Sequence, residues 1–430
     1  MNLFSPLITR LESLLTHPWF VPVCFLTFIG IRLALIVFIP VEPSSDAAWY
    51  INMAVNLSER GSYSENGVPT AYWPVGYPAF LALLFNFTGP HLVVVQLANL
   101  FLAACTFWLL FYFVRAVFDN NLTARLSIFL LTLYPNNAVY ASFALSEVLY
   151  TCLLLFVSVL LVTSRSKSTL LLIGVTLGLA TLVKAQTVLL APLLVVIAVL
   201  KNWSLDALQP AIIRALAVSA VMLAVVAPWT FRNYTAFGEF ILVSTNGGQS
   251  LLAGNNSSVV GDYRHDYSDK DPVFKEVGFS VENQVAADKR AGQLAKQWIL
   301  ENPGDFIGLL PKKFFRLWGP DGEGEWAYQG TPWYDQQVKW FRLARVINQA
   351  YYFLLLGGFA FAIRKLWRTP AKPKLYYGLV IAAYFTFISL VFSGQSRYHF
   401  PVMPFVMAYA AWIGAGILRS ERRVATAHLI

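Results

Sequence analysis

The chain has 430 residues, of which 57% are hydrophobic and only 13% are charged, and its mean hydropathy is +0.56. Soluble proteins are nearer half apolar and a quarter charged, so this composition excludes an ordinary soluble domain and predicts a membrane protein. The net charge of +9 does not indicate nucleic-acid binding, because an excess of Lys and Arg is typical of the cytoplasmic loops of membrane proteins.

Apolar runs recur along the chain and predict about ten membrane spans. They lie at 18–40, 92–114, 124–142, 147–163, 169–183, 187–200, 211–228, 346–363, 375–392 and 399–418. Lys and Arg cluster in alternate connections, which by the positive-inside rule places these connections and both termini in the cytoplasm. The outer side then receives the first loop (42–90), the segment around Glu147, the turn after Lys184, the stretch 229–345 and the loop 393–400.

The first outer loop predicts a helix that lies flat at the membrane surface. Ser45 is a good N-cap residue and Gly61 a good stop, so we expect a helix over 46–60 with its apolar and polar residues on different sides. Asp46 falls in the first turn, where the helix dipole stabilises a carboxylate, and Tyr50 follows at i+4. This stretch alone leaves open whether Asp46 is catalytic or only starts the helix.

The remaining polar segments predict three regions. Residues 1–238 form an N-terminal transmembrane module, 239–345 a small outer domain, and 346–430 the C-terminal transmembrane helices. The outer domain is expected to be α+β, because strand-like runs such as 240–244 precede an amphipathic helix at 281–300. The stretch 74–87 is apolar but short and begins with prolines, so it is expected to be re-entrant or interfacial. The stretch 305–318 mixes aromatic with basic residues, as interfacial helices do.

Ionisable residues at membrane depth are costly and indicate function by default. Nearly all of them here fall at the outer ends of spans, namely Asp46, Glu147, Lys184, Arg232, Arg397 and His399, while Arg32 lies inside the first span. Such a set suits a transferase in which cations hold a phosphate leaving group and a carboxylate takes a proton from the attacking hydroxyl.

Each of these residues also has a structural interpretation that the sequence leaves open. Glu147 is a favourable acid at a helix start, and Lys184 reaches the interface by snorkelling. Arg232 anchors the chain to lipid headgroups, and His399 caps a carbonyl. For Arg32 we expect a pairing with Glu147 or with a lipid phosphate.

The chain resembles a membrane glycosyltransferase of the GT-C superfamily, close to the bacterial dolichyl-phosphate-mannose–protein mannosyltransferase-like branch (glycosyltransferase family 39) and to the lipid A aminoarabinose transferases. The order of several short motifs carries this resemblance. They are Arg32, Asp46-Ala-Ala-Trp-Tyr50, Gly61-Ser-Tyr63, Trp73-Pro-Val-Gly-Tyr-Pro78, Ser146-Glu147, Gly178-Leu-Ala-Thr-Leu-Val-Lys184, Pro228-Trp-Thr-Phe-Arg-Asn-Tyr234 with Phe237-Gly238, Asn246-Gly-Gly248, Leu252-Ala-Gly-Asn-Asn256 and Ser396-Arg-Tyr-His-Phe-Pro401.

The resemblance implies an all-α polytopic membrane protein with the GT-C fold, interfacial helices in its first outer loop and a small α+β outer domain. It also implies transfer of a sugar from a polyprenyl-phosphate-linked donor to a glycan, lipid or protein acceptor at the periplasmic face of a bacterial inner membrane. By this resemblance the catalytic residues are Asp46 and Glu147. The residues expected to hold the donor phosphate are Lys184, Arg397, Arg232 and Arg32, and those expected to contact substrate are Tyr50, Tyr63, Tyr77, Tyr398 and His399.

Two departures from the family pattern leave the sugar, the acceptor and a divalent cation open. Many relatives carry two adjacent acids in the first loop, whereas Ser45 and Ala47 flank Asp46 here, and many have Arg-Pro where this chain has Lys184-Ala185. The sequence assigns no metal ligands or other cofactor, and no nucleic-acid partner. It shows no Walker loop, GxGxxG, HExxH or GxSxG, which argues against an ATPase or a serine hydrolase.

Two other function classes remain open from the sequence. A transporter or flippase of lipid-linked glycans would show polar or broken helices near the midplane and often internal repeats. A non-catalytic subunit of an envelope glycan assembly complex would use the outer domain as a docking surface. Release of free lipid phosphate from the donor separates the transferase from both.

Overall fold

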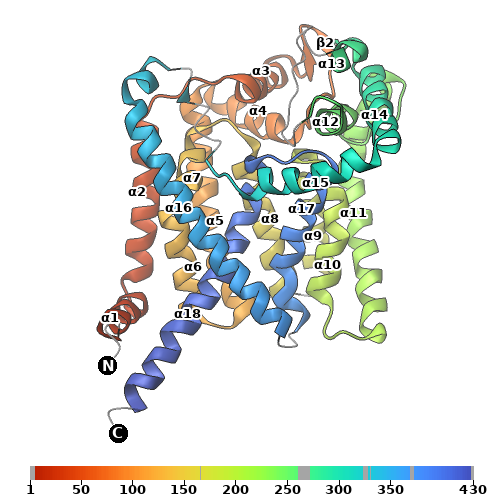
Figure 1. Ribbon diagram of the computed structural model, residues 1–430. Helices are drawn as coiled ribbons and strands as arrows, with labels where there is room; N and C mark the ends of the chain where they lie inside the picture. The colour runs from red at the N-terminus through yellow and green to blue at the C-terminus, as the bar shows by residue number, and fades with distance from the viewer. Residues whose placement is uncertain are drawn as a thin grey trace.

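The structure of the protein is a computed structural model that describes residues 5–164, 166–259, 272–322, 328–329, 331–368 and 372–427. Each predicted span overlaps an apolar helix of the bundle (Figure 1). These helices are α2 (Phe20–Phe38), α5 (Leu92–Phe118), α6 (Asn121–Leu133), α8 (Ser146–Thr163), α9 (Lys167–Val183), α10 (Thr187–Val199), α11 (Leu205–Phe237), α16 (Pro332–Arg368), α17 (Tyr377–Val391) and α18 (Met403–Ala427). The stretch predicted at 124–142 follows α6 only as far as Leu133.

Length and composition divide these helices into two groups. Within the described residues, seven helical segments are long and apolar enough to cross a membrane, whereas α6, α9 and α10 are apolar but shorter. The protein is therefore an all-α, multi-pass membrane protein, and the count of ten spans stays a prediction.

The two ends of the molecule differ in what they carry (Figure 1). At the lower end lie α1 (Ser5–Thr16), the C-terminal part of α18, and the connections that follow α10 and α16. At the upper end lie α3 (Ser45–Arg60), α4 (Gly76–Thr88) and the helices between α11 and α16. This separation agrees with the predicted grouping of both termini with the basic connections.

The first loop folds as predicted, with small differences. Helix α3 begins at Ser45, one residue earlier than expected, and Ser44 rather than Ser45 occupies the N-cap position. Gly61 adopts the left-handed conformation (φ 63°) that ends the helix, as its lack of Cβ allows. Beyond it, β1 (Ser64–Glu65) pairs antiparallel with β2 (Val68–Pro69) around the turn residues Asn66 and Gly67, both of which have positive φ.

The segment between α11 and α16 corrects the α+β expectation. Its described regular elements are all helices: α12 (Gly247–Gly254), α13 (Pro272–Val277), α14 (Gln284–Glu301) and α15 (Pro303–Trp318). The strand-like run 240–244 pairs with no strand in the described part of the chain, because side chains of α11 occupy its carbonyls. Trp229 Nε1 donates to Val243 O (2.7 Å), Thr230 Oγ1 to Leu242 O (2.8 Å) and Asn233 Nδ2 to Ile241 O (3.2 Å). The predicted boundary at 345 falls inside α16.

Short elements connect the core helices. After α6 come α7 (Pro135–Val139) and the 3-10 helix η1 (Tyr140–Ser142); η3 (Pro373–Tyr376) lies at the lower end, in the connection between α16 and α17, and η4 (Ser396–Val402) leads into α18 (Figure 1). The first residues of α18, from Met403 to Tyr409, are almost completely buried at the centre of the bundle. Because lipid tails are as apolar as these side chains, close van der Waals packing holds the bundle together inside a bilayer.

Candidate active site

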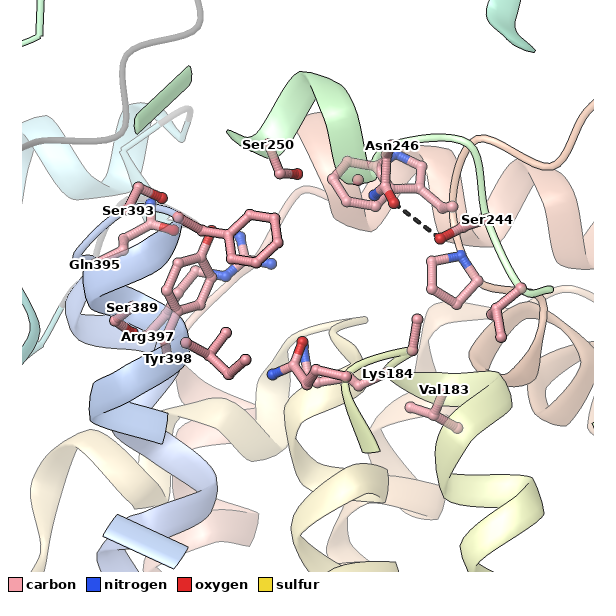
Figure 2. Close-up of a pocket in the computed structure, with 18 of the residues that line it drawn as sticks. Val183, Lys184, Ser244, Asn246, Ser250, Ser389, Ser393, Gln395, Arg397 and Tyr398 are labelled. Carbon is pink, nitrogen blue, oxygen red and sulfur yellow. Dashed lines mark hydrogen bonds between the residues drawn. The ribbon is translucent and has the colours of Figure 1, made fainter. Parts of the chain in front are cut away.

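A cavity of about 640 Å³ lies at the upper end of the molecule, beneath the segment that leads into α12 (Figure 2). Figure 2 shows Lys184 below the open space, Arg397 and Tyr398 on one side, and Ser250 and Asn246 above it. The lining includes Ser45, Asp46, Tyr50, Trp73, Pro74, Val183, Lys184, Ala185, Gln186, Val188, Leu189, Leu242, Val243, Ser244, Asn246, Gly247, Ser250, Phe385, Ile388, Ser389, Phe392, Ser393, Gln395, Arg397 and Tyr398.

Four ionisable side chains form a chain of alternating charge at this cavity. Arg397 Nη1 donates to Asp46 Oδ2 (2.9 Å), and Arg397 Nε lies 3.4 Å from Glu147 Oε1. The same Glu147 oxygen accepts from Lys184 Nζ at 3.1 Å. Glu147 is 1% exposed, whereas the other three side chains are 13–19% exposed. Glu147 is therefore the buried centre to which both cations are attached.

Local structure explains the placement of each charge. Asp46 and Glu147 lie in the first turns of α3 and α8, where the positive end of the helix dipole stabilises a carboxylate. Lys184 is the C-cap residue of α9, at the negative end of that helix. Arg397 lies on η4, whose short connection between α17 and α18 fixes its position. Residues more than 350 positions apart in the sequence thus meet, because their helix ends gather at one level.

A tight contact brings the first loop against Lys184. A Cβ on Gly76, the first residue of α4, would lie 2.6 Å from the backbone of Leu182 and Val183 at the end of α9. Only glycine allows this approach, which sets the start of α4 beside the C-terminal end of α9.

Tyr50 closes the cavity next to Asp46. Its ring is 5% exposed and packs edge-on against Tyr77, with ring centroids 5.2 Å apart. Burial, and after it the negative charges of Asp46 and Glu147, raise the pKa of Tyr50. The phenol therefore stays protonated and can donate a hydrogen bond.

The structure brings together six of the residues selected from the sequence. Asp46, Lys184, Arg397, Tyr50 and Tyr398 line the cavity, and Glu147 lies directly behind both cations. The other predicted site residues are absent from the lining: Arg32, Tyr63, Tyr77, Arg232 and His399.

Arg232 and Tyr63 hold the first loop in place. Arg232 Nη2 donates to Tyr63 O (2.6 Å) and Nη1 to Thr70 O (2.8 Å), so the guanidinium satisfies two carbonyls on either side of the hairpin. The Tyr63 hydroxyl donates to Trp73 O at 3.1 Å. These contacts assign both residues to positioning the loop that carries Trp73 rather than to the cavity surface.

The expected pairing of Arg32 with Glu147 is wrong. Arg32 is fully buried, its Nη2 donates to Asn137 Oδ1 (2.6 Å), and its Nη1 donates to Phe28 O (3.0 Å). Its guanidinium also lies 3.4 Å from the centroid of the Phe28 ring. Arg32 therefore faces α7. The sequence predicts how deep Arg32 lies in its span, but it does not predict the direction in which the side chain points around α2.

His399 belongs to a buried polar network centred on Asp321, a residue that sequence reasoning missed. His399 Nε2 lies 3.0 Å from Asp321 Oδ1, and both side chains are fully buried. Tyr134 Oη (2.7 Å) and Asn348 Nδ2 (2.9 Å) donate to Asp321 Oδ2. Because His399 lies two residues beyond Arg397 on η4, this network fixes the turn that presents Arg397. No motif around Asp321 marks it in the sequence.

A second group of missed residues supplies uncharged polar atoms to the cavity. These residues are Gln186, Ser244, Asn246, Ser250, Ser389, Ser393 and Gln395. Their amides and hydroxyls can both donate and accept hydrogen bonds, as recognition of a polyhydroxylated group requires. They come from three separate stretches of the chain, at 186, 244–250 and 389–395, so no local pattern identifies them.

One wall of the cavity is apolar and reaches the outer surface of the bundle. It is formed by Val188 and Leu189 of α10 together with Phe385 and Ile388 of α17, and Leu189 is 60% exposed. The cavity thus joins a polar, charged half to an apolar half that meets the surface facing the lipid.

Lys313 of α15 connects α12, which lies above the cavity, to α17, which lines its apolar wall. Its Nζ donates to Asn255 Oδ1 (2.7 Å), directly after α12, and to Leu390 O (3.1 Å) near the end of α17. A Cβ on Gly254 would overlap the carbonyl oxygen of Phe392, so α12 packs directly on this end of α17. Lys313 was not singled out in the sequence, where it is one of two adjacent basic residues.

We predict a pH dependence of stability that depends on Lys313. Burial lowers the pKa of Lys313 from 10.5 to about 8, so between these values the unfolded chain binds more protons than the folded one. Stability should therefore rise with pH through this window. In thermal unfolding, the melting temperature of wild type relative to that of Lys313→Met should increase between about pH 8 and pH 10. Substitution of the exposed neighbour Lys312 by Met should show no such gain. A constant difference between wild type and Lys313→Met would contradict the prediction.

Two carboxylates lie at the cavity, Asp46 and Glu147, and each is paired with cations of the protein. Across the described ranges, no group of three His, Cys, Asp or Glu side chains converges. Asp46 is paired with Arg397 through Oδ2, and Glu147 with both Arg397 and Lys184 through Oε1, so cations of the protein engage one oxygen of each carboxylate.

Comparison with known proteins places this architecture in a class. The family model of dolichyl-phosphate-mannose-protein mannosyltransferases matches residues 73–231. The Archaeoglobus fulgidus oligosaccharyltransferase in complex with Zn and sulfate is similar over 94% of this chain and 50% of its own, with a TM-score of 0.54 and 13% identity. The chain therefore has the fold of the GT-C superfamily of membrane glycosyltransferases.

Two further structures and one negative result complete the comparison. The archaeal oligosaccharyltransferase AglB from the same organism, in complex with an inhibitory peptide and a dolichol-phosphate, is similar over 96% of this chain and 52% of its own, at 12% identity and a TM-score of 0.54. ArnT from Cupriavidus metallidurans, bound to undecaprenyl phosphate, is similar over 91% of this chain and 76% of its own, at 14% identity and a TM-score of 0.42. The chain spans about half the length of the oligosaccharyltransferase. No curated protein matches the chain.

Proposed function

We propose that the protein is a glycosyltransferase that moves a sugar from a polyprenyl-phosphate-linked donor to a hydroxyl or amine acceptor. The observation that carries the proposal is the alternating chain Asp46–Arg397–Glu147–Lys184 at the junction of a polar and an apolar half-cavity. A lipid-linked sugar phosphate is divided in the same way as the cavity: its tail is apolar, whereas its phosphate is charged and its sugar carries hydroxyls.

Arg397 and Lys184 are the cations that hold the donor phosphate. Their two positive charges are balanced by the negative charges of Asp46 and Glu147, so the net formal charge of the four side chains is zero before the donor binds. When the sugar leaves, the phosphate oxygen gains negative charge, and preorganised donors aimed at that oxygen stabilise the transition state more than the ground state. Buried Glu147 acts by fixing both cations.

Asp46 is the base. Its Oδ2 accepts from Arg397, and within the described part of the chain no other hydrogen bond is made to its carboxylate, so Oδ1 is available to the acceptor. The acceptor O–H or N–H proton passes to this oxygen while the acceptor atom bonds to the anomeric carbon and the bond from that carbon to the phosphate oxygen breaks. Tyr50 beside Asp46 donates a hydrogen bond to a substrate oxygen.

The donor tail lies along the apolar wall formed by α10 and α17. Exposed Leu189 at the edge of this wall lets an isoprenoid chain reach the cavity from the bilayer without crossing the polar half. The positive-inside pattern supports an active site on the non-cytoplasmic face, which in a bacterial inner membrane is the periplasmic face. The similarity to an oligosaccharyltransferase whose structure contains a dolichol-phosphate supports a lipid-linked donor.

The test is donor cleavage by the purified full-length protein. We expect incubation with an undecaprenyl-phosphate-linked monosaccharide and an extract of envelope acceptors to release free undecaprenyl phosphate in step with sugar incorporation. A flippase or a non-catalytic subunit leaves the donor intact. Transbilayer movement of the donor without release, or no reaction with any of several lipid-linked sugars, would overturn the proposal.

A further inference from the structure

A second cavity, of about 300 Å³, lies between α3 and the β1–β2 hairpin at the upper end of the molecule. It shares no lining residue with the cavity that contains Lys184 and Arg397. We refer to it as the hairpin pocket. It is lined by Trp49, Asn52, Met53, Val55, Asn56, Arg60, Glu65 and Asn66.

The protein itself fixes the shape of the hairpin pocket. Trp49 Nε1 donates to Glu65 Oε2 (3.2 Å), and Asn56 Nδ2 donates to Ser64 O (2.8 Å), so the hairpin is tied to α3 at two points. The positive φ of Asn66 and Gly67 sets the tight turn that forms the far wall. A site with a preset shape binds a ligand without first ordering its own walls.

Three side chains at this pocket are available to a ligand. Asn52, Arg60 and Asn66 are exposed, and none makes a hydrogen bond or ion pair to any other described residue. Their side-chain polar groups are therefore free of partners within the described chain. They surround a half-buried Trp49 and the apolar side chains of Met53 and Val55.

From this combination we infer that the hairpin pocket is a binding site for a carbohydrate built of neutral sugar units. A sugar ring presents C–H groups on its faces, which pack on an aromatic or aliphatic surface, and hydroxyls around its rim, which both donate and accept hydrogen bonds. The half-buried Trp49 and Val55 match the first property, and the amides of Asn52 and Asn66 match the second. Arg60 and Glu65 carry opposite charges, so the pocket favours neither an anionic nor a cationic ligand.

The hairpin pocket adjoins the candidate active site through one layer of aromatic rings. Trp49 packs edge-on against Tyr50 and Trp73, with centroids 5.9 Å and 6.4 Å apart, and both of these rings line the larger cavity. Asn52 lies six residues beyond Asp46 on α3, which is about 9 Å along the helix axis. A glycan that extends from the pocket past these rings approaches Asp46. That this glycan is the acceptor rests on the proposed function, whereas the binding of a carbohydrate in the hairpin pocket does not.

The experiment is a direct binding measurement on the full-length protein in lipid nanodiscs, prepared without alkyl glycosides because their sugar headgroups would compete. The probes are trisaccharides of glucose, galactose and mannose, observed by saturation-transfer NMR. We expect at least one of them to bind wild type. Asn52→Ala combined with Arg60→Ala should weaken that binding by at least about tenfold, because each substitution removes a hydrogen-bonding group. Both side chains are exposed, so thermal stability should not change.

Two comparisons make the result decisive. Glu59→Ala changes an exposed residue of the same helix that does not line the pocket, and it should bind like wild type. Asp46→Asn should keep carbohydrate binding and lose transfer, so the failure of the proposed function is seen separately from the failure of this site. Absence of binding by all three trisaccharides, or binding unaffected by the double substitution, would overturn the inference.

Discussion

Replacement of Asp46 by Asn is expected to lower the rate of sugar transfer by about three orders of magnitude, because general-base catalysis contributes about 10²–10⁴-fold. Asparagine has nearly the same shape, and its amide oxygen can still accept from Arg397, which contacts Asp46 at 2.9 Å in the wild type. Proton transfer should therefore be lost while the donor still binds. The measurement is the initial rate of undecaprenyl phosphate release together with the KM for the donor.

The matched control for Asp46→Asn is Glu59→Gln, which removes a carboxylate from the exposed side of the same helix. It should transfer at the wild-type rate. If Asp46→Asn turned over like wild type, the carboxylate would have no part in proton transfer. A large rise in KM with an unchanged kcat would instead assign Asp46 to substrate binding.

Replacement of Arg397 by Lys should lower kcat by about two orders of magnitude, although it keeps the positive charge. Arg397 contacts Asp46 through Nη1 and Glu147 through Nε at the same time, and a single ammonium group cannot span both acids. The lysine variant also loses the planar fork that holds a phosphate with two parallel hydrogen bonds. Steady-state kinetics with the lipid-linked donor measures the effect, and the KM for the donor should rise as well.

A double-substitution cycle separates this role from a general loss of structure. Because Glu147 holds Arg397 in place, Glu147→Gln and Arg397→Lys should be strongly non-additive, the double variant being little slower than the slower single variant. Arg419→Lys, at an exposed arginine of α18 that contacts Asn120, is the control and should leave transfer unchanged. Additive effects would show that Arg397 and Glu147 act independently.

Membrane depth was the property of the site most easily predicted from sequence. The sequence predicts Asp46, Glu147, Lys184 and Arg397 as site residues because they fall at the outer ends of predicted spans, and the structure brings all four together. The same criterion selected Arg232 and His399, which lie at the correct level but face the first loop and the Asp321 network. Depth follows from hydropathy along the chain, whereas the direction a side chain faces depends on how its helix is rotated against its neighbours.

The outer segment illustrates a second kind of limit. Residues 240–244 have the composition of a strand, but β-structure requires a partner strand, and α11 supplies side-chain donors instead. Asp321 could not be recognised for a related reason. Its significance depends on Tyr134, Asn348 and His399, which come from three distant segments and are joined to it only in the folded chain.

By itself the sequence determined that the protein is a multi-pass membrane protein, where its apolar helices lie, and which polar segments share one end of the bundle. These properties depend on the residues and their immediate neighbours, because the bilayer selects helices by length and hydropathy. Only the tertiary structure decided that Asp46, Arg397, Glu147 and Lys184 form one chain of ion pairs, and that α3 and the hairpin enclose a second pocket. Those features arise from packing between distant segments, whose geometry is set by the whole chain at once.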